Sequence, residues 1–63
     1  MPAKFELYKD VGDKFRFRLI GANGEIVAEG QGYGSKEGCL DGIKFVKAEA
    51  SKAEIVDLSL KKT

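Results

Sequence analysis

The chain has 63 residues, 33% of them charged, and its eleven Lys and Arg against ten Asp and Glu leave a formal net charge of +1. This length predicts one domain over residues 1–63, and so small a domain buries little surface when it folds alone. The charge balance excludes strong overall attraction to nucleic acid or anionic membranes. One cysteine and no histidine exclude an intrachain disulfide and a closed zinc site of four Cys or His ligands.

Membrane and export signals are absent from the sequence pattern. No apolar run approaches the ~20 residues of a transmembrane helix. The first residues, Met1-Pro2-Ala3-Lys4, lack the apolar stretch of a signal peptide. Together with a single cysteine, this predicts a cytoplasmic protein that does not associate with membranes.

Three segments near the N-terminus alternate apolar and polar side chains with the period of a β-strand. They cover residues 4–9, 14–20 and 25–30. A turn cluster over residues 10–13 joins the first two, and Gly12 is free to take positive φ there.

The Asn23-Gly24 pair between the second and third segments predicts a two-residue type I′ hairpin turn, in which both residues have positive φ. Such a turn fixes which residues lie opposite each other in the two strands. The expected pairs are Leu19–Ala28 and Phe17–Gly30 on one face, and Ile20–Val27, Arg18–Glu29 and Arg16–Gln31 on the other.

A glycine-rich corner over residues 30–34 must turn the chain off the sheet. Ser35 is a suitable N-cap for a helix that runs to about Ala50. Its apolar residues recur at helical spacing and form one stripe, Cys39, Ile43, Val46 and Ala50. After a linker over residues 51–53, residues 54–60 predict a fourth strand.

The element order is therefore β-β-β-α-β in an α+β fold, an antiparallel meander with one helix packed on one face. The fourth strand follows the helix after few residues. It can join an edge of its own sheet or be exchanged with a second subunit, and the sequence leaves both arrangements open.

No residue pattern indicates catalysis, a cofactor or a metal. Cys39 lies on the apolar helix stripe without a histidine to act as its base, which favours a core role over a nucleophile. The Gly32-Tyr33-Gly34-Ser35-Lys36 segment has neither phosphate-loop nor dinucleotide-binding spacing. The chain is therefore not expected to be an enzyme.

Nucleic-acid binding is an alternative, because a basic sheet face with an aromatic side chain can hold single strands. Acidic residues Glu6 and Glu29 share that face, and a cross-strand charge ladder is the structural interpretation of the same pattern. The residues expected to contact an anion or a nucleic acid are Arg16, Arg18, Ser35 and Lys36, with Tyr8 beside them.

Apolar residues also fall outside the surfaces that the helix and sheet would bury against each other. Contiguous exposed apolar surface is typical of an interface. Two helix glycines one turn apart cost helix stability, which close approach of another backbone or ring would explain. The expected dimer interface contains Tyr8, Ile20, Val27, Gly38, Gly42 and Phe45.

As an ordered string, a set of residues along the chain resembles the YegP-like family of small bacterial and archaeal proteins of unassigned function. The matching residues are Arg18, Leu19, Ala22, Asn23, Gly24, Glu25, Gly32, Tyr33, Ser35, Lys36, Cys39, Gly42, Ile43, Val46 and Lys47. The resemblance implies a β-β-β-α-β unit that occurs singly or in tandem, with two units packed together, and hence a homodimer for one unit. It implies no catalytic residue.

The function expected from the sequence is that of a homodimeric interaction or accessory module without catalysis. Weak binding of single-stranded nucleic acid through the basic and aromatic sheet face is the second hypothesis.

Overall fold

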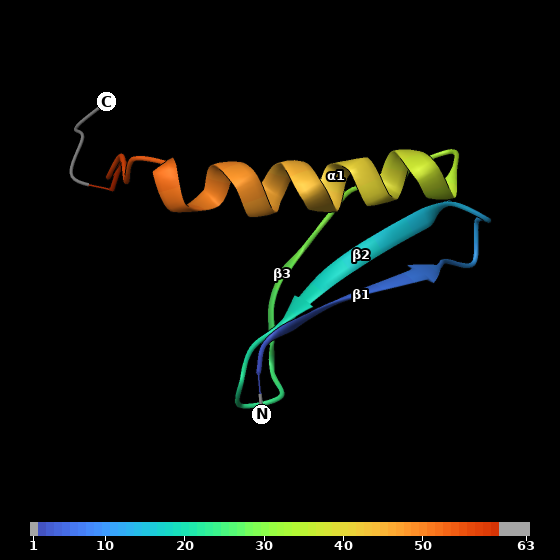
Figure 1. Cartoon of the computed structure of the whole chain (residues 1–63), viewed down its shortest axis with the longest axis horizontal. Coiled ribbons are helices and arrows are strands. Elements are labelled where there is room, and N and C mark those ends of the chain that lie inside the picture. Colours follow the sequence, from blue (N-terminus) through green and yellow to red (C-terminus); the bar gives the residue numbers. More distant parts are fainter. Residues whose placement is uncertain (1, 60–63) are drawn as a thin grey trace.

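The computed structural model describes residues 2–59 as a three-stranded antiparallel sheet with a helix on one face (Figure 1). Consecutive strands are hydrogen-bonded neighbours in the order β1-β2-β3. This confirms the α+β class and the β-β-β-α order expected from the pattern of residues. The elements are β1 (Lys4–Lys9), β2 (Phe15–Ile20), β3 (Ile26–Glu29), α1 (Lys36–Glu49) and a short 3-10 helix η1 (Ala50–Lys52).

The turn between β1 and β2 is a three-residue loop. The Asp10 N–H donates to the Lys14 carbonyl at 2.9 Å, and the Asp13 N–H donates to the Asp10 carbonyl at 3.0 Å. Asp13, rather than Gly12, takes the positive φ of this loop, at 64°. The Asp10 carboxylate accepts from the Gly12 and Lys14 N–H groups and holds this loop.

The turn between β2 and β3 has the same hydrogen-bond pattern. The Gly21 N–H donates to the Glu25 carbonyl at 2.8 Å, and the Gly24 N–H donates to the Gly21 carbonyl at 2.9 Å. Gly24 has φ of 86°, whereas Asn23 does not have positive φ. The expected type I′ turn was therefore wrong, because a three-residue loop needs the left-handed conformation only at its last residue.

A β-bulge compensates for the longer loop. Ile20 lies opposite Ile26 instead of the expected Val27, whereas Arg18 lies opposite Glu29 as expected. Val27 is thus an extra residue in β3, and it restores the register that the loop had shifted by one. The expected pairs that the structure confirms are Arg18–Glu29, Leu19–Ala28 and Phe17–Gly30.

The core of the described chain centres on Phe17, which is 6% exposed, and Cys39, which is fully buried. The Phe17 ring makes an edge-to-face contact with Phe5 at 5.9 Å between centroids and stacks on Tyr33 at 6.3 Å. It also lies directly over Gly30, where a Cβ atom would be 2.5 Å from Phe17 Cζ. The predicted pairing of an aromatic ring with a strand glycine is confirmed.

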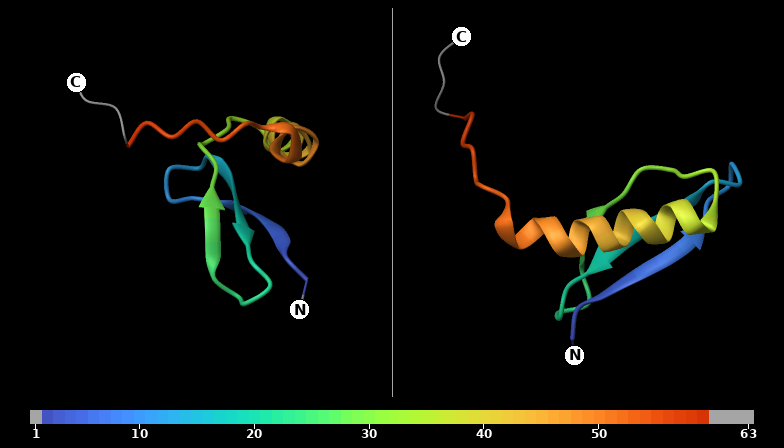
Figure 2. Two further views of the ribbon diagram at one scale, coloured as in Figure 1. Left: turned by 90° about the vertical axis from the view of Figure 1, so that its left-hand side faces the viewer. Right: turned by 45° about the horizontal axis from the view of Figure 1, so that its top comes forward.

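Helix α1 begins after Ser35, whose hydroxyl accepts the Gly38 N–H at 3.0 Å. This confirms the predicted N-cap. The helix contacts β1 and β2 but not β3 (Figure 2). The inner face of β3 is therefore left without a covering layer from the described chain.

The expected fourth strand is not formed within residues 54–59. These residues are exposed and have no regular secondary structure, and Ala53 before them is extended. The segment leaves the end of α1 and runs away from the sheet (Figure 1). Leu60, the last residue of the predicted strand, lies outside the described residues.

Candidate functional site

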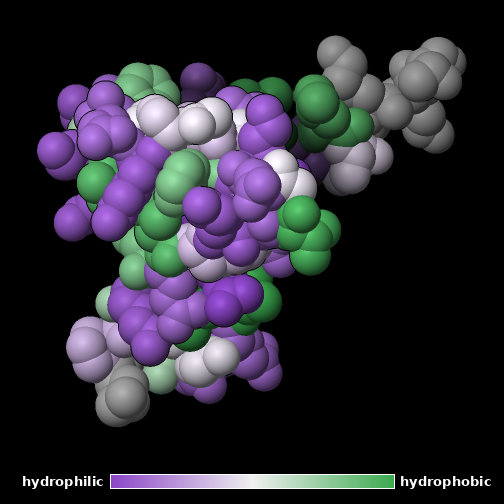
Figure 3. Space-filling model, turned by 90° about the vertical axis from the view of Figure 1, so that its right-hand side faces the viewer, coloured by the Kyte–Doolittle hydropathy of each residue, from purple (hydrophilic) through white to green (hydrophobic). Residues whose placement is uncertain are grey.

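Uncovered apolar side chains are the clearest candidate for a functional surface. All four residues of β3 are exposed, with Val27 at 63%. In the C-terminal segment Ile55 is 94% exposed, and Val56 and Leu58 are exposed as well. Figure 3 shows apolar groups, drawn in green, at several places on one face of the molecule. Neither β3 nor residues 54–59 are buried by the rest of the described chain.

The helix also carries large exposed apolar residues. Phe45 is 67% exposed and does not lie on the stripe that faces the sheet. Leu40 is also exposed, although less so. Exposed apolar side chains on the helix and on β3 are candidates for an interaction surface.

The outer face of the sheet, which points away from α1, carries the basic and aromatic residues. The Arg18 Nε donates to a Glu6 carboxylate oxygen at 2.8 Å, and its guanidinium lies over the Tyr8 ring at 4.7 Å. Lys4 Nζ lies 3.3 Å from the other Glu6 oxygen. The Arg18 hydrogen bond, followed by that of Lys4, lowers the pKa of Glu6. The structure thus brings Tyr8 and Arg18 together as predicted for a binding face, but each is already the stacking partner of the other.

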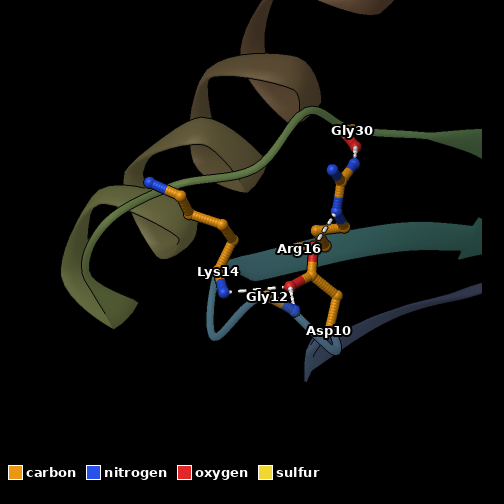
Figure 4. Close-up of polar contacts among 5 residues, drawn as sticks. All are labelled: Asp10, Gly12, Lys14, Arg16 and Gly30. Atoms are coloured by element: carbon orange, nitrogen blue, oxygen red, sulfur yellow. Dashed lines mark hydrogen bonds and ion pairs between the residues drawn. The ribbon is translucent and has the colours of Figure 1, made fainter.

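Arg16 is held by Asp10 rather than by Glu29 across the sheet. Its Nε is hydrogen-bonded to the Asp10 carboxylate, and its Nη1 donates to the Gly30 carbonyl at 3.4 Å (Figure 4). The Arg16 hydrogen bond is the main cause that lowers the pKa of Asp10, followed by the Lys14 N–H. Arg16 and Arg18 therefore each have a carboxylate partner of their own, as in a charge ladder.

Ser35 and Lys36 stand at the start of α1, where an anion was expected to bind. The Ser35 hydroxyl is already an acceptor for the helix N–H of Gly38. Lys36 is exposed. Their geometry is that of an N-cap followed by a solvated side chain.

Cys39 has the environment of a core residue. Its side chain is fully buried, and burial raises the pKa of its thiol, which disfavours the reactive thiolate. Over residues 2–59 the structure shows no ligand pocket and no cluster of three metal-ligating side chains. The same residues include no helix long and apolar enough to cross a membrane.

The six residues predicted for a dimer interface fall on two different surfaces. Tyr8 and Ile20 belong to the half-buried strands β1 and β2, and Val27 is on the exposed strand β3. The helix contributes Gly38, Gly42 and Phe45.

The two helix glycines have a partner within their own chain. A Cβ atom on Gly42 would lie 2.7 Å from Tyr33 Cζ, and one on Gly38 would lie 3.1 Å from the Ser35 hydroxyl. Tyr33 is therefore the ring that approaches Gly42, whereas the group nearest to a Cβ atom on Gly38 is the Ser35 hydroxyl, so both glycines have a close neighbour within their own chain.

Sequence reasoning did not anticipate the roles of Asp10 and Tyr33. Asp10 holds a turn and an arginine at once. The signal for the turn was an aspartate two residues before a glycine, since aspartate side chains accept backbone N–H groups two residues on. For Tyr33 the signal was the glycine pair, one turn apart, on the helix that follows it.

These observations describe a small α+β module with few buried apolar residues among those described, and with ion pairs on the outer face of its sheet. Residues 10–57 match the model of a domain of unknown function, DUF1508. A "UPF0339 protein" of Treponema denticola is 52% identical over 58 residues, which cover 92% of this chain and 100% of that protein. The chain belongs to the DUF1508 family, which confirms the expected resemblance to small domains of unknown function.

Two further comparisons bear on structure and size. A solution structure of a protein from Haloferax volcanii has a TM-score of 0.82 and 42% identity, covering 89% of this chain and 95% of that one. A "UPF0339 protein in ptx operon 5'region" of Stutzerimonas stutzeri is 44% identical over 50 residues, 79% of this chain and 45% of that protein. That relative is thus about twice as long as the region it shares with this chain.

Proposed function

We propose that the chain is a homodimeric interaction module without catalysis, in which two copies complete each other's core. The observation that carries the proposal is the small number of buried side chains. Only Phe17 and Cys39 among residues 2–59 are buried hydrophobic residues. A domain of this size that folds alone needs more apolar burial than that, or a disulfide, a metal or a partner.

The shape of the chain supports the same proposal. Its radius of gyration is 14.1 Å, whereas a compact domain of this length has one of about 11 Å. The helix covers β1 and β2, while β3 and the C-terminal segment extend from the packed part. A second copy, with its own helix and C-terminal segment, offers the apolar groups that would fill these places.

We further propose that the fourth strand, expected over residues 54–60, is exchanged between the two copies. In the described part, residues 53–59 run away from their own sheet (Figure 1). The double-length relative from Stutzerimonas stutzeri is consistent with two units that work as a pair. A cytoplasmic location belongs to the proposal, since the fully buried Cys39 is a free thiol.

The mass of the protein in solution tests the proposal. Size-exclusion chromatography with light scattering, at micromolar concentration, should give twice the 6.9 kDa of one chain. A single species of 6.9 kDa would overturn it.

Weak binding of single-stranded nucleic acid is the second candidate. The stack of Arg18 on Tyr8 favours it, because an arginine–aromatic pair on an open sheet face can extend into stacking on a base. The ion pairs of Arg18 with Glu6 and of Arg16 with Asp10 weigh against it, since these carboxylates repel phosphate.

Fluorescence anisotropy with a labelled single-stranded oligonucleotide at several salt concentrations distinguishes the two candidates. A nucleic-acid protein should lose affinity steeply with salt, and exchanging Arg16→Glu and Arg18→Glu together should flatten that dependence. Salt-independent or undetectable binding by the wild type removes the second candidate and leaves the first unaffected.

A further inference from the structure

Strand β3 lies at the edge of the sheet and is interrupted at both ends by an extra residue. At one end Val27 is unpaired, because Ile20 pairs with Ile26 and Leu19 with Ala28. At the other end two residues of the β3 side, Gln31 and Gly32, lie opposite one residue of β2. This follows from the hydrogen bond of Gly30 to Phe17 and the double hydrogen bond between Tyr33 and Phe15. The regular part of this edge is therefore Ala28–Gly30.

Glu29 supplies the free backbone groups of that regular part. The Gly30 N–H donates to the Phe17 carbonyl of β2 at 2.9 Å. In an antiparallel ladder the next pair along the strands turns its N–H and C=O groups outward. That next pair is Arg18 and Glu29, so the Glu29 N–H and C=O point away from β2, toward the open edge.

We propose that Ala28–Gly30 is a pairing window, a short edge segment bounded by the two bulges, and that it pairs with the C-terminal segment of a second copy. The window is too short to pair with a longer strand. The inference rests on the proposed homodimer and specifies which backbone groups join its two chains. The occupant is residues 55–59 of the partner, and its pairing is centred on the N–H and C=O of Glu29.

The side chains of the two segments suit each other. Val56 and Leu58 are two residues apart, so they project to one face of an extended segment, and both are exposed in the described chain. On β3 the residues of the face toward the helix layer are the small Ala28 and Gly30, and the Phe17 ring lies over Gly30 on this face. The apolar side chains of the incoming segment would therefore join the same core.

The bulges also explain why such an open edge would stop at two chains. A long flat edge strand pairs with further edges and forms open aggregates, and bulges limit this by disrupting the ladder. A window of three residues gives a short pairing that ends where Val27 and Gln31 begin. The result is a closed pair of chains rather than a filament.

Two proline substitutions in the full chain test the window. Glu29→Pro removes the N–H that points to the open edge and leaves the hydrogen bonds of β3 to β2 in place, as proline on an edge strand can. Gln31→Pro is the matched control, because Gln31 is a bulge residue directly outside the window. We expect Glu29→Pro to raise the dimer dissociation constant roughly 10- to 100-fold, and Gln31→Pro to leave it within about threefold.

The outcomes separate this inference from the proposed homodimer. If wild type is monomeric, the homodimer itself is overturned. If wild type is dimeric and Glu29→Pro dimerises equally well, the window is overturned while the homodimer stands. If both variants dissociate alike, the bulge does not bound the pairing.

Amide hydrogen exchange of the wild-type dimer gives a second readout that needs no variant to fold. The Glu29 amide should exchange slowly, and the Gln31 amide should exchange rapidly. Rapid exchange at Glu29, or equal protection at both amides, would overturn the window.

Discussion

The ring of Tyr33 occupies the space that a side chain on Gly42 would need. A Cβ atom on Gly42 would lie 2.7 Å from Tyr33 Cζ, closer than real Cβ atoms approach other heavy atoms. Tyr33 also stacks on Phe17 and forms the last bridge to β2 through Phe15. One ring thus joins the glycine-rich corner, the helix and the sheet.

Gly42→Ala should destabilise the fold, although alanine favours helix more than glycine does. The added methyl group must displace Tyr33, at a cost of about 1–3 kcal/mol, and the gain in helix propensity offsets about 1 kcal/mol of that. Thermal unfolding at fixed protein concentration measures the difference. Gly34→Ala is the control, because a Cβ atom there meets nothing within 4 Å and its φ is not positive. Equal loss in both variants would contradict the role of Tyr33.

Gly24→Val should destabilise the chain through the backbone alone. Gly24 has φ of 86°, a region that a β-branched residue enters at a cost of about 1–3 kcal/mol, and a Cβ atom there meets no other group. Glu25→Gln, next to the turn, should cost less than about 0.5 kcal/mol. Chemical denaturation of both variants measures this. A Gly24→Val protein as stable as wild type would mean that the loop does not close at Gly24.

Asp10→Asn should lower the free energy of unfolding near neutral pH, and it should make that free energy less dependent on pH in the acidic range. Arg16 holds the pKa of Asp10 below its ordinary value. A lowered folded-state pKa gives stability that is present above the ordinary pKa of about 3.9 and is lost as pH falls through the lower value. The difference between wild type and Asp10→Asn in unfolding free energy should therefore shrink as pH falls below about 4.

The control for this acid dependence is Asp41→Asn, which changes an exposed helix carboxylate. This variant removes one carboxylate and leaves the ion pair of Asp10 with Arg16 in place. Glu6 also has a lowered pKa, so the wild-type curve alone would not assign the effect to Asp10. A difference for Asp10→Asn that does not change with pH would contradict the ion pair with Arg16.

The hairpin shows how far residue patterns predict this fold. Alternation placed β2 and β3 within one residue of their observed bounds. The register expected from the turn paired Arg18 with Glu29 correctly, because the bulge at Val27 offsets the longer loop. The Asn23-Gly24 signal located the turn, but it does not distinguish a two-residue loop from a three-residue loop that places only Gly24 at positive φ. The bulge at Val27 has no signal of its own in the residue pattern, because it only compensates for the length of that loop.

The candidate site was predicted less completely than the fold, for a physical reason. Apolar residues outside one chain's own core are visible in the sequence, and Val27 and Phe45 were found in this way. The approach of Tyr33 to Gly42 depends on where the glycine-rich corner leads the chain, which no periodicity specifies. The spacing of residues along the chain therefore identified exposed apolar side chains, but it did not identify the groups that pack against a given residue.

Phe45→Ser is expected to weaken dimerisation more than it weakens the fold of one chain. Phe45 is 67% exposed, so a single copy gains little from it, whereas burial in an interface would give about 1.5–3 kcal/mol for a side chain of this kind. Sedimentation equilibrium should show a dissociation constant raised roughly tenfold or more, with the helix content by circular dichroism unchanged. Val11→Ser is the matched control, because Val11 is fully exposed at the tip of the β1–β2 turn and far along the chain from β3. If both variants dimerise like wild type, Phe45 lies outside the interface, and the surface that joins the two copies is confined to β3 and the C-terminal segment.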